Sequence, residues 1–538
     1  MMSLGVKGNR KDASVVDLID DIHRTERETS MNQIPGQEKT RQQFSQSSRK
    51  THRKRLHPFA TRRSGTHAVH RHILCLLGLC FILAWPSNAK SQETEIKNIL
   101  FIVSDDLKAS VLGCYGDEVC QTPNIDRLAG QGTVFQRAYC QGTWCAPSRQ
   151  SFMFSRYKSG GTVNMGENFR NNNFYSARVG KIYHMRVPGD IIAGTNGLDV
   201  ASSWTQRFNS AGQEAHSPGE YACLNLNIFT NELANRQSTK MPHRPYVTVK
   251  LDGDGSKQAD YKSADKAIEI LRERQESDQP FFLAVGLVRP HYPMVAPKSI
   301  FELYPWQEIQ LPVKRENDLA DIPKMGMGKS MSNKNKMGDY PDNQKRMWAG
   351  YYASVSFMDA QVGRIIGELE RLGLRESTAI VFTSDHGYHL GEHEFWQKSN
   401  LHEEVTRVPL VISAPGYQPG VSLSPVELVD LYPTLSDLTR IPVPDGVQGK
   451  SLVSILADPK ERVRESALSL HNGYSLRSDR WAFIRYSDGS EELYDMNSDP
   501  NQFTNLAGSV QHVEFVAENR AALQTRLAQE NLEWPKGK

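Results

Sequence analysis

The sequence predicts an α/β fold: a large mixed, mostly parallel sheet flanked by helices, followed by a smaller C-terminal antiparallel α+β subdomain. Three observations predict this fold class. Continuous apolar runs of strand length recur along the chain, the pattern of strands buried on both faces of a sheet. Segments with helical spacing of apolar residues alternate with these runs. After about residue 465, short segments of alternating polarity with turn residues between them take over.

The elements of the larger part follow in chain order. Strands are expected at residues 98–104, 175–179, 281–288, 378–383 and 408–413. A helix is expected to open at Thr122-Pro123, another to follow the turn at Cys145, and longer amphipathic helices to cover residues 262–274 and 343–372. The polar stretch 314–345 is expected to be a long surface loop.

The C-terminal subdomain is expected to be a small antiparallel sheet closed by a helix. Its strands are predicted at residues 467–470, 474–477, 481–486 and 492–494, with turns at Asn472-Gly473 and Asp488-Gly489. The closing helix is predicted over residues 513–529. The expected domains are therefore a catalytic domain at residues 95–460 and the subdomain at residues 461–538.

The first 89 residues differ from the rest in charge. They hold 15 Lys and Arg but 7 Asp and Glu, so the net charge of +3 belongs to this leader and the remaining chain is mildly acidic. The overall basic balance is therefore no evidence for a nucleic-acid partner. Residues 1–70 are rich in Ser, Gln and Arg and are expected to form a disordered basic leader.

Residues 71–89 are predicted to be a secretory signal peptide. The uncharged run 73–85 follows arginines, precedes Ser87-Asn88-Ala89, and is shorter than the ~20 residues that a membrane span needs. The prediction is an exported protein, periplasmic or extracellular, without a stable membrane anchor. An uncleaved anchor and a later start at Met31 remain alternatives.

Five cysteines remain after this segment. An odd number in an exported protein leaves at least one thiol unpaired, and Cys145 is the candidate for it. The other four could pair in three ways, between which the sequence does not choose: Cys114, Cys120, Cys140 and Cys223.

Carboxylates follow two of the predicted strands. Asp105-Asp106 ends the first strand and Asp385-His386 ends the fourth. Carboxyl ends of parallel strands meet at one edge of the sheet, where ligands gather, so these side chains are expected to lie together. Three carboxylates favour a hard divalent ion such as calcium or magnesium, although His386 could instead bind the substrate.

Cationic or proton-donating side chains are expected around this metal. The candidates are Arg149, Lys181, His184, His291 and Lys398. Each alone could be an ordinary turn histidine or solvated lysine. Together, after strand ends, they suit an anion such as sulfate or phosphate.

The motif Cys145-Ala146-Pro147-Ser148-Arg149 resembles the Cys-x-Pro-Ser-Arg signature of the sulfatase family, in the alkaline-phosphatase-like superfamily. Further matching segments are Val103–Asp106, Thr122–Asp126, Gly180–His184, Ser384–Gly387, Val429–Thr434, Leu493–Asp495 and Asp499-Pro500. Within the family, the chain is most similar to the iduronate-2-sulfatase branch, on the residues Arg289–Pro293, Asp385-His386, Leu390–His393 and Trp396–Lys398.

The resemblance implies a chemistry for these residues. In that family a formylglycine-generating enzyme converts the cysteine, here Cys145, to formylglycine, whose hydrate attacks the sulfate ester. One calcium ion would be bound by Asp105, Asp106, Asp385, His386 and the modified Cys145. Arg149 would hold the hydrate, Lys181 and His184 would contact hydrate and sulfate, and His291 and Lys398 would bind sulfate and help protonate the leaving alcohol.

The predicted function is thus a sulfuric ester hydrolase acting on a sulfated carbohydrate, with a 2-O-sulfated uronic acid as the candidate sugar. Two alternatives remain open. One is a phosphomonoester or phosphonate hydrolase of the same superfamily. The other is an inactive carbohydrate-binding relative, because Phe152–Arg156 keeps only the arginine of the family's Leu-Leu-Thr-Gly-Arg, which the converting enzyme reads.

Overall fold

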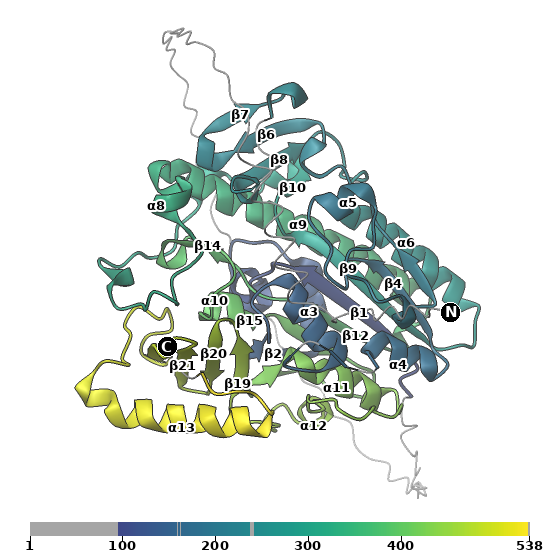
Figure 1. Ribbon diagram of the computed structural model, residues 1–538. Coiled ribbons are helices and arrows are strands. Elements are labelled where there is room, and N and C mark those ends of the chain that lie inside the picture. Colours follow the sequence, from purple (N-terminus) through teal and green to yellow (C-terminus); the bar gives the residue numbers. More distant parts are fainter. Residues whose placement is uncertain (1–94, 159, 162, 237–240, 536–538) are drawn as a thin grey trace, which may run out of the picture. The chain divides into compact units, whose positions relative to one another are not determined.

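A computed structural model describes residues 95–538, apart from residues 159, 162, 237–240 and 536–538 (Figure 1). The predicted leader and signal peptide lie outside the described residues. An eight-stranded sheet runs through the described part in the order β17-β2-β16-β12-β1-β9-β4-β5. Its strands are β1 (Asn98–Asp105), β2 (Thr133–Phe135), β4 (Tyr175–Gly180), β5 (Gln206–Phe208), β9 (Phe281–Pro290), β12 (Thr378–Ser384), β16 (Leu410–Ser413) and β17 (Gly420–Ser422).

The sheet is mixed and mostly parallel, as predicted. Neighbouring strands run parallel throughout except on either side of β16, which is antiparallel to both β12 and β2. All five strand segments predicted for this domain are present, as β1, β4, β9, β12 and β16. The fold class predicted from the sequence is therefore confirmed.

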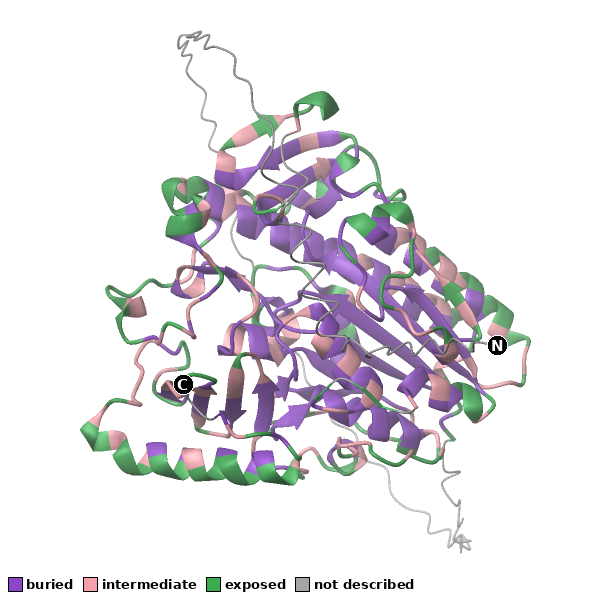
Figure 2. Cartoon of the chain, in the orientation of Figure 1, coloured by how far each residue is buried: buried purple, intermediate pink, exposed green. Residues whose placement is uncertain are grey.

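Helices cover both faces of the sheet. Leu100 and Ile102 of β1 pack in one core with α6 and α9, whereas Ile99, Phe101 and Val103 pack in another with α3, α4 and α11. Figure 2 shows the central strands buried along their length. The helices are α2 (Pro123–Ala129), α3 (Cys145–Phe154), α4 (Met165–Asn171), α5 (Gly189–Ala193), α6 (Ala259–Gln275), α7 (Lys298–Phe301), α8 (Ser332–Asn335), α9 (Pro341–Arg371), α10 (Glu403–Thr406), α11 (Leu431–Leu438) and α12 (Val453–Ala457).

Three small sheets in this part were not predicted. They are β10 (Met294–Pro297), β8 (Val247–Leu251), β6 (Gly219–Cys223) and β7 (Ile228–Thr230); β11 (Ser330–Met331), β14 (Phe395–Gln397) and β13 (His389–Leu390); and β15 (Arg407–Val408), β3 (Ala138–Tyr139) and β18 (Val426–Glu427). The surface loop predicted over residues 314–345 is wrong in part, because it contains β11 and α8 and the start of α9. Strands of two residues are too short to show a period in the sequence.

The C-terminal elements match the prediction closely. β19 (Ala467–Leu470), β20 (Gly473–Arg477), β21 (Trp481–Tyr486) and β22 (Glu491–Asp495) form one antiparallel sheet, and α13 covers Val513–Gln529. One face of the sheet packs on α13 and the other on Leu401. Among the described helices, none is long and apolar enough to cross a membrane.

Candidate active site

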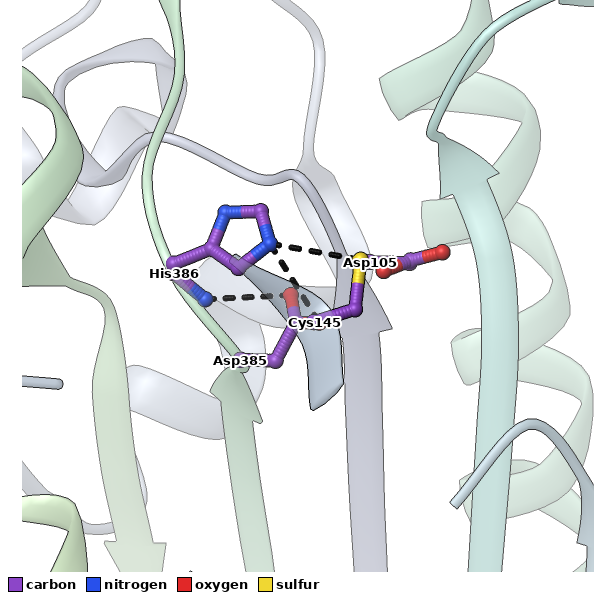
Figure 3. A group of neighbouring side chains, drawn as sticks. All are labelled: Asp105, Cys145, Asp385 and His386. Carbon is purple, nitrogen blue, oxygen red and sulfur yellow. Dashed lines mark hydrogen bonds and ion pairs between the residues drawn. The ribbon is translucent and has the colours of Figure 1, made fainter. Parts of the chain in front are cut away.

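Parallel pairing brings the predicted strand-end residues together. β1 and β12 pair in parallel with Ser104 opposite Ser384, so Asp105-Asp106 and Asp385-His386 leave the same edge of the sheet. Asp105 is paired with Pro290 of β9, which brings His291 to that edge as well. Figure 3 shows Asp105, Asp385 and His386 at these strand ends, with Cys145 beside them. The prediction that topology gathers these groups is confirmed.

Cys145 is the first residue of α3 and lies inside this group. Its Sγ is 3.0 Å from Lys398 Nζ, 3.4 Å from His386 Nε2 and 3.8 Å from Lys181 Nζ. Burial and the charge of Asp105 raise the pKa of the thiol, but the positive charges of Lys181 and Lys398 outweigh them and the pKa lies below its ordinary value. The helix N-terminus adds partial positive charge at the same place. The position therefore favours an anionic or electron-rich side chain.

Arg149 connects the segments that carry Asp105, Lys181 and Asp385. Its Nε donates to Asp385 Oδ2 at 2.8 Å and its Nη2 to Asp105 Oδ1 at 3.2 Å. Its Nη1 donates to the main-chain oxygens of Lys181 and Ile182. Since every guanidinium nitrogen is engaged within the chain, Arg149 orients the carboxylates. Lys181 pairs with Asp105 from the other side.

Asp106 has an unusual backbone and an unpaired oxygen. Its φ is +63°, a conformation that a non-glycine residue keeps only where its surroundings impose it. Oδ1 contacts Lys398 Nζ and lies 3.3 Å from His386 Nε2, whereas Oδ2 is buried without a hydrogen bond among the described residues. Burial raises the pKa of this carboxyl to about 7. Asp106 Oδ2 is thus a buried carboxylate oxygen that is available to a further ligand.

The donor set fits a hard divalent cation. Two groups of side chains hold ligand atoms within 4.8 Å of one another: Asp105, Cys145, Asp385 and His386, and Asp105, Asp106, Cys145 and His291. They share Asp105 and Cys145, so they describe one centre. Three carboxylates and the unpaired Asp106 Oδ2 are the oxygen-rich environment that such a cation prefers. His291 appears here as a possible ligand, a role that the sequence did not suggest.

The two remaining histidines differ in their contacts. His291 Nδ1 lies 2.8 Å from the carbonyl of Tyr292, and its Nε2 is 3.7 Å from Asp106 Oδ2. His184 stacks edge-on against Trp144 at 6.2 Å and makes no hydrogen bond or ion pair with the cluster among the described residues. Burial and the charge of Lys181 lower the pKa of His184 to about 3. His184 therefore lies beside the contact network and is neutral at pH 7.

Sequence reasoning missed three supporting residues. Ser148 Oγ donates to the Asp385 carbonyl, and Tyr351 OH donates to the Asp106 carbonyl at 2.6 Å. Tyr292 packs its ring 4.1 Å from the His291 ring. Ser148 and Tyr292 stand inside or beside quoted motifs and could have been considered. Tyr351 is one of many buried residues of α9, so nothing in the sequence distinguishes it.

The departure from the family signature has a structural counterpart. Ser155 ends α3 with φ +50°, the left-handed conformation that glycine adopts most easily. Its hydroxyl donates to the Val429 carbonyl at 2.6 Å and accepts from Gly449 N at 3.0 Å. These buried hydrogen bonds offset the strain, so the helix ends here as it would with glycine.

None of the five described cysteines forms a disulfide. None of the three pairings left open by the sequence is therefore present, and Cys145 is one of the five free thiols in the described part of the chain.

Comparison with known proteins identifies relatives over most of the chain. Residues 97–441 match the family described as "Sulfatase", and residues 391–530 match "N-sulphoglucosamine sulphohydrolase, C-terminal". A sulfatase of Formosa agariphila is 30% identical over 500 residues, covering 85% of this chain and 92% of the relative.

Two vertebrate relatives have nearly the same identity. Human iduronate 2-sulfatase is 32% identical over 69% of this chain and 74% of its own length. Bovine arylsulfatase K is 30% identical over 80% of this chain and 81% of its own length. The branch predicted from the sequence is therefore not distinguished from this second one.

Solved structures share the fold. The phosphonate monoester hydrolase of Silicibacter pomeroyi superposes with a TM-score of 0.66 at 21% identity, covering 81% of this chain and 96% of that one. At this identity the likeness concerns the fold alone.

Proposed function

Because the chain belongs to the sulfatase family, we propose that it removes sulfate from a sulfated carbohydrate through a formylglycine made from Cys145 and one calcium ion. Hydrolysis of sulfate esters follows from the family; the sugar, the modification and the ion are the proposal. One observation carries it: Cys145 Sγ has the side-chain nitrogens of Lys181, His386 and Lys398 within 4 Å, beside three buried aspartates.

Calcium is proposed because the donors are hard. Asp105, Asp106 and Asp385 supply carboxylate oxygens, and His386 and the modified Cys145 complete the set. The formylglycine hydrate would supply an oxygen nucleophile, and the cation would neutralise charge on the sulfuryl oxygens. Arg149 donates to Asp105 and Asp385 and would keep both carboxylates in place around the cation.

Two lysines supply the positive charge on the substrate side. Lys181 and Lys398 both lie within 4 Å of Cys145 Sγ, where they would contact sulfate oxygens. Burial lowers the pKa of Lys398, but Asp106 and Cys145 raise it more, so the ammonium keeps its protons at pH 7.

His291, unlike Lys398, has no proton to donate on the nitrogen that faces the site. A carbonyl oxygen can only accept, so the contact with Tyr292 puts the proton of the neutral ring on Nδ1 and leaves a lone pair on Nε2. We therefore assign the proton donor of the leaving alcohol to Lys398 and an orienting role to His291. His184, neutral and beside Trp144, would border the bound sugar.

The substrate and setting are proposed from the relatives. A relative named iduronate 2-sulfatase supports a sulfated uronic acid, with sulfate at O2 as the candidate position. A formylglycine-generating enzyme is the expected maturation partner, and we propose export to the periplasm or the exterior without a stable membrane anchor. Nucleic acid is not an expected ligand.

Mass spectrometry of the chain made with a formylglycine-generating enzyme, combined with sulfate-release assays, tests the proposal. We expect an aldehyde at Cys145, thiols in the peptides of Cys114, Cys120, Cys140 and Cys223, and no sulfate release from Cys145→Ala. Phosphate monoesters and phosphonates serve as the competing substrates. An unmodified Cys145 without sulfate release, or faster hydrolysis of a phosphonate than of every sulfate ester, would contradict it.

A further inference from the structure

Arg244 carries a charge beside the site that no described residue neutralises. It opens a short 3₁₀ turn, Arg244–Tyr246, and its guanidinium carbon lies 5.7 Å from the centre of the Tyr292 ring. Within the described part of the chain it makes no ion pair, and its Nε is buried without a hydrogen-bond partner. Two buried arginines of the core, Arg149 and Arg289, both pair with carboxylates. A buried donor left unpaired costs free energy, so a ligand that accepts from it is favoured.

The location of Arg244 relates it to the sulfate site. The Tyr292 ring lies against the His291 ring with 4.1 Å between centres. The two separations place the guanidinium within about 10 Å of His291. That is the span of one sugar ring with a substituent on either side, so one residue of a substrate can reach both.

An unpaired guanidinium nitrogen alone is no sign of a site. Arg274 also has a buried Nε without a partner and packs over Tyr175 at 4.1 Å. Tyr175 begins β4, however, whereas Lys181 follows the end of the same strand. Arg274 therefore lies at the opposite edge of the sheet, far from Cys145, and is a matched control for Arg244.

The turn that carries Arg244 is fixed to the segment that carries Lys398. Tyr246 is buried, and Asn335 Nδ2 donates to its hydroxyl at 2.6 Å. Its ring packs edge-on against Trp396, two residues before Lys398, with 5.9 Å between centres. A guanidinium held in place on packed aromatic rings is preorganised to bind a ligand.

We propose that Arg244 binds the carboxylate of an acidic sugar whose sulfate group is held at the Cys145 centre. This inference rests on the proposed function, which it narrows to sulfated uronic acids. The planar guanidinium matches a carboxylate with two parallel hydrogen bonds, which a neutral sugar cannot accept in the same way. Arg244 thus sets specificity and takes no part in the chemical step.

Kinetics of Arg244→Ala, Arg244→Lys and the control Arg274→Ala test this on three substrates. They are a 2-O-sulfated uronide, the matching sulfated hexoside with a hydroxymethyl group in place of the carboxylate, and an aryl sulfate. We expect Arg244→Ala to lower kcat/KM for the uronide by about 10- to 100-fold, the loss of one charged hydrogen-bonded pair. The other two substrates should be unaffected, Arg244→Lys should retain part of the preference, and Arg274→Ala should behave as wild type.

An equal loss on all three substrates, or no loss on the uronide, overturns the inference. If the wild type hydrolyses the aryl sulfate but Arg244→Ala has the same substrate preference as wild type, the proposed function stands and the role of Arg244 is refuted. If the wild type released no sulfate at all, the proposed function would fail instead. Calorimetric binding of the sulfated uronide to wild type and Arg244→Ala then decides the role of Arg244, since equal affinity refutes it.

Discussion

Glu492→Gln should destabilise the protein and displace the segment that carries Lys398. His402 Nε2 lies 2.8 Å from Glu492 Oε2, and neither side chain is exposed at all. Glu492 also accepts hydrogen bonds from Tyr486 and Tyr494, both at 2.6 Å. The pair joins β22 of the C-terminal sheet to a residue four positions after Lys398, so it lies between the subdomain and the active site.

The expected cost follows from the burial of the pair. Breaking a buried hydrogen bond to a carboxylate costs about 1.5–3 kcal/mol, because the His402 donor is left without its charged acceptor. Glutamine keeps the shape and one acceptor for the tyrosines, so we expect a loss within this range in the free energy of unfolding. Glu465→Gln is the control, since this side chain is 89% exposed and its ion pair is with Arg462 of the same surface segment; its unfolding free energy should match wild type.

Denaturant unfolding and sulfate release measure the two consequences. A misplacement of Lys398 by about 1 Å should lower kcat/KM by up to about 100-fold in protein that is still folded. A Glu492→Gln protein as stable as Glu465→Gln would refute the account of the pair. Full activity in a destabilised Glu492→Gln protein would refute its coupling to Lys398.

The pH dependence gives the same pair a second test. Burial raises the pKa of Glu492, but the charge of His402 and the hydrogen bonds lower it more, so it lies below its ordinary value of 4.5. A lowered folded-state pKa contributes stability that is present above the unfolded pKa and is lost as the pH falls through the folded value. The stability gap between wild type and Glu492→Gln should therefore be full above pH 4.5 and narrow below it.

Three further predictions concern the site and its helix. Asp106→Asn should bind less calcium, measured by elemental analysis of the purified protein, while Asp437→Asn on α11 should not; equal metal content would remove Asp106 from the ligand set. Lys398→Ala should lower kcat by about 10²- to 10³-fold, as expected for the loss of one electrostatic stabiliser, and an unchanged kcat would return the proton-donor role to His291. Ser155→Ala should lower the free energy of unfolding by about 1–3 kcal/mol, because it keeps the strained backbone and leaves buried groups unpaired, whereas Ser155→Gly should cost less; the reverse order would show that the backbone strain is negligible.

The elements that could be predicted are those whose apolar residues form a long continuous run or a regular spacing along the sequence. β1, β9 and β12 are continuous apolar runs buried on both faces, and α13 has the same bounds in the sequence prediction and in the structure. The strand-end carboxylates could be predicted for the same reason, because parallel topology alone brings Asp105 and Asp385 to one edge. The strands of two or three residues could not, since so short a run shows no alternation and depends on its tertiary partners. β6, β8 and β10 were also missed, although they are as long as the predicted β19 and β22.

Contacts between segments that are distant in the sequence could not be predicted either. Nothing local relates Arg244 to Tyr292 or His402 to Glu492, and each of these residues has an ordinary neighbourhood in the sequence. The resemblance predicted that Arg149 holds the formylglycine hydrate. In the structure its guanidinium nitrogens donate to Asp105, Asp385 and main-chain oxygens, and the sequence could not show these partners. Side-chain roles of this kind depend on competition between partners that only the folded chain reveals.

Contacts from distant segments also hold Lys398 in place in a strained stretch of backbone. The residues on either side of it, Gln397 and Ser399, have φ of +73° and +74°, which is unfavourable for both. Such strain persists only where surrounding contacts exceed its cost. Those contacts are the pairing of β14 with β13 and β11, the hydrogen bond from Ser399 N to the Thr143 carbonyl at 3.0 Å, and the buried pair of His402 with Glu492. The last of them comes from β22, so the position of Lys398 depends on the C-terminal sheet, and a chain cut before that sheet would keep every predicted metal ligand yet lose the geometry of its lysine.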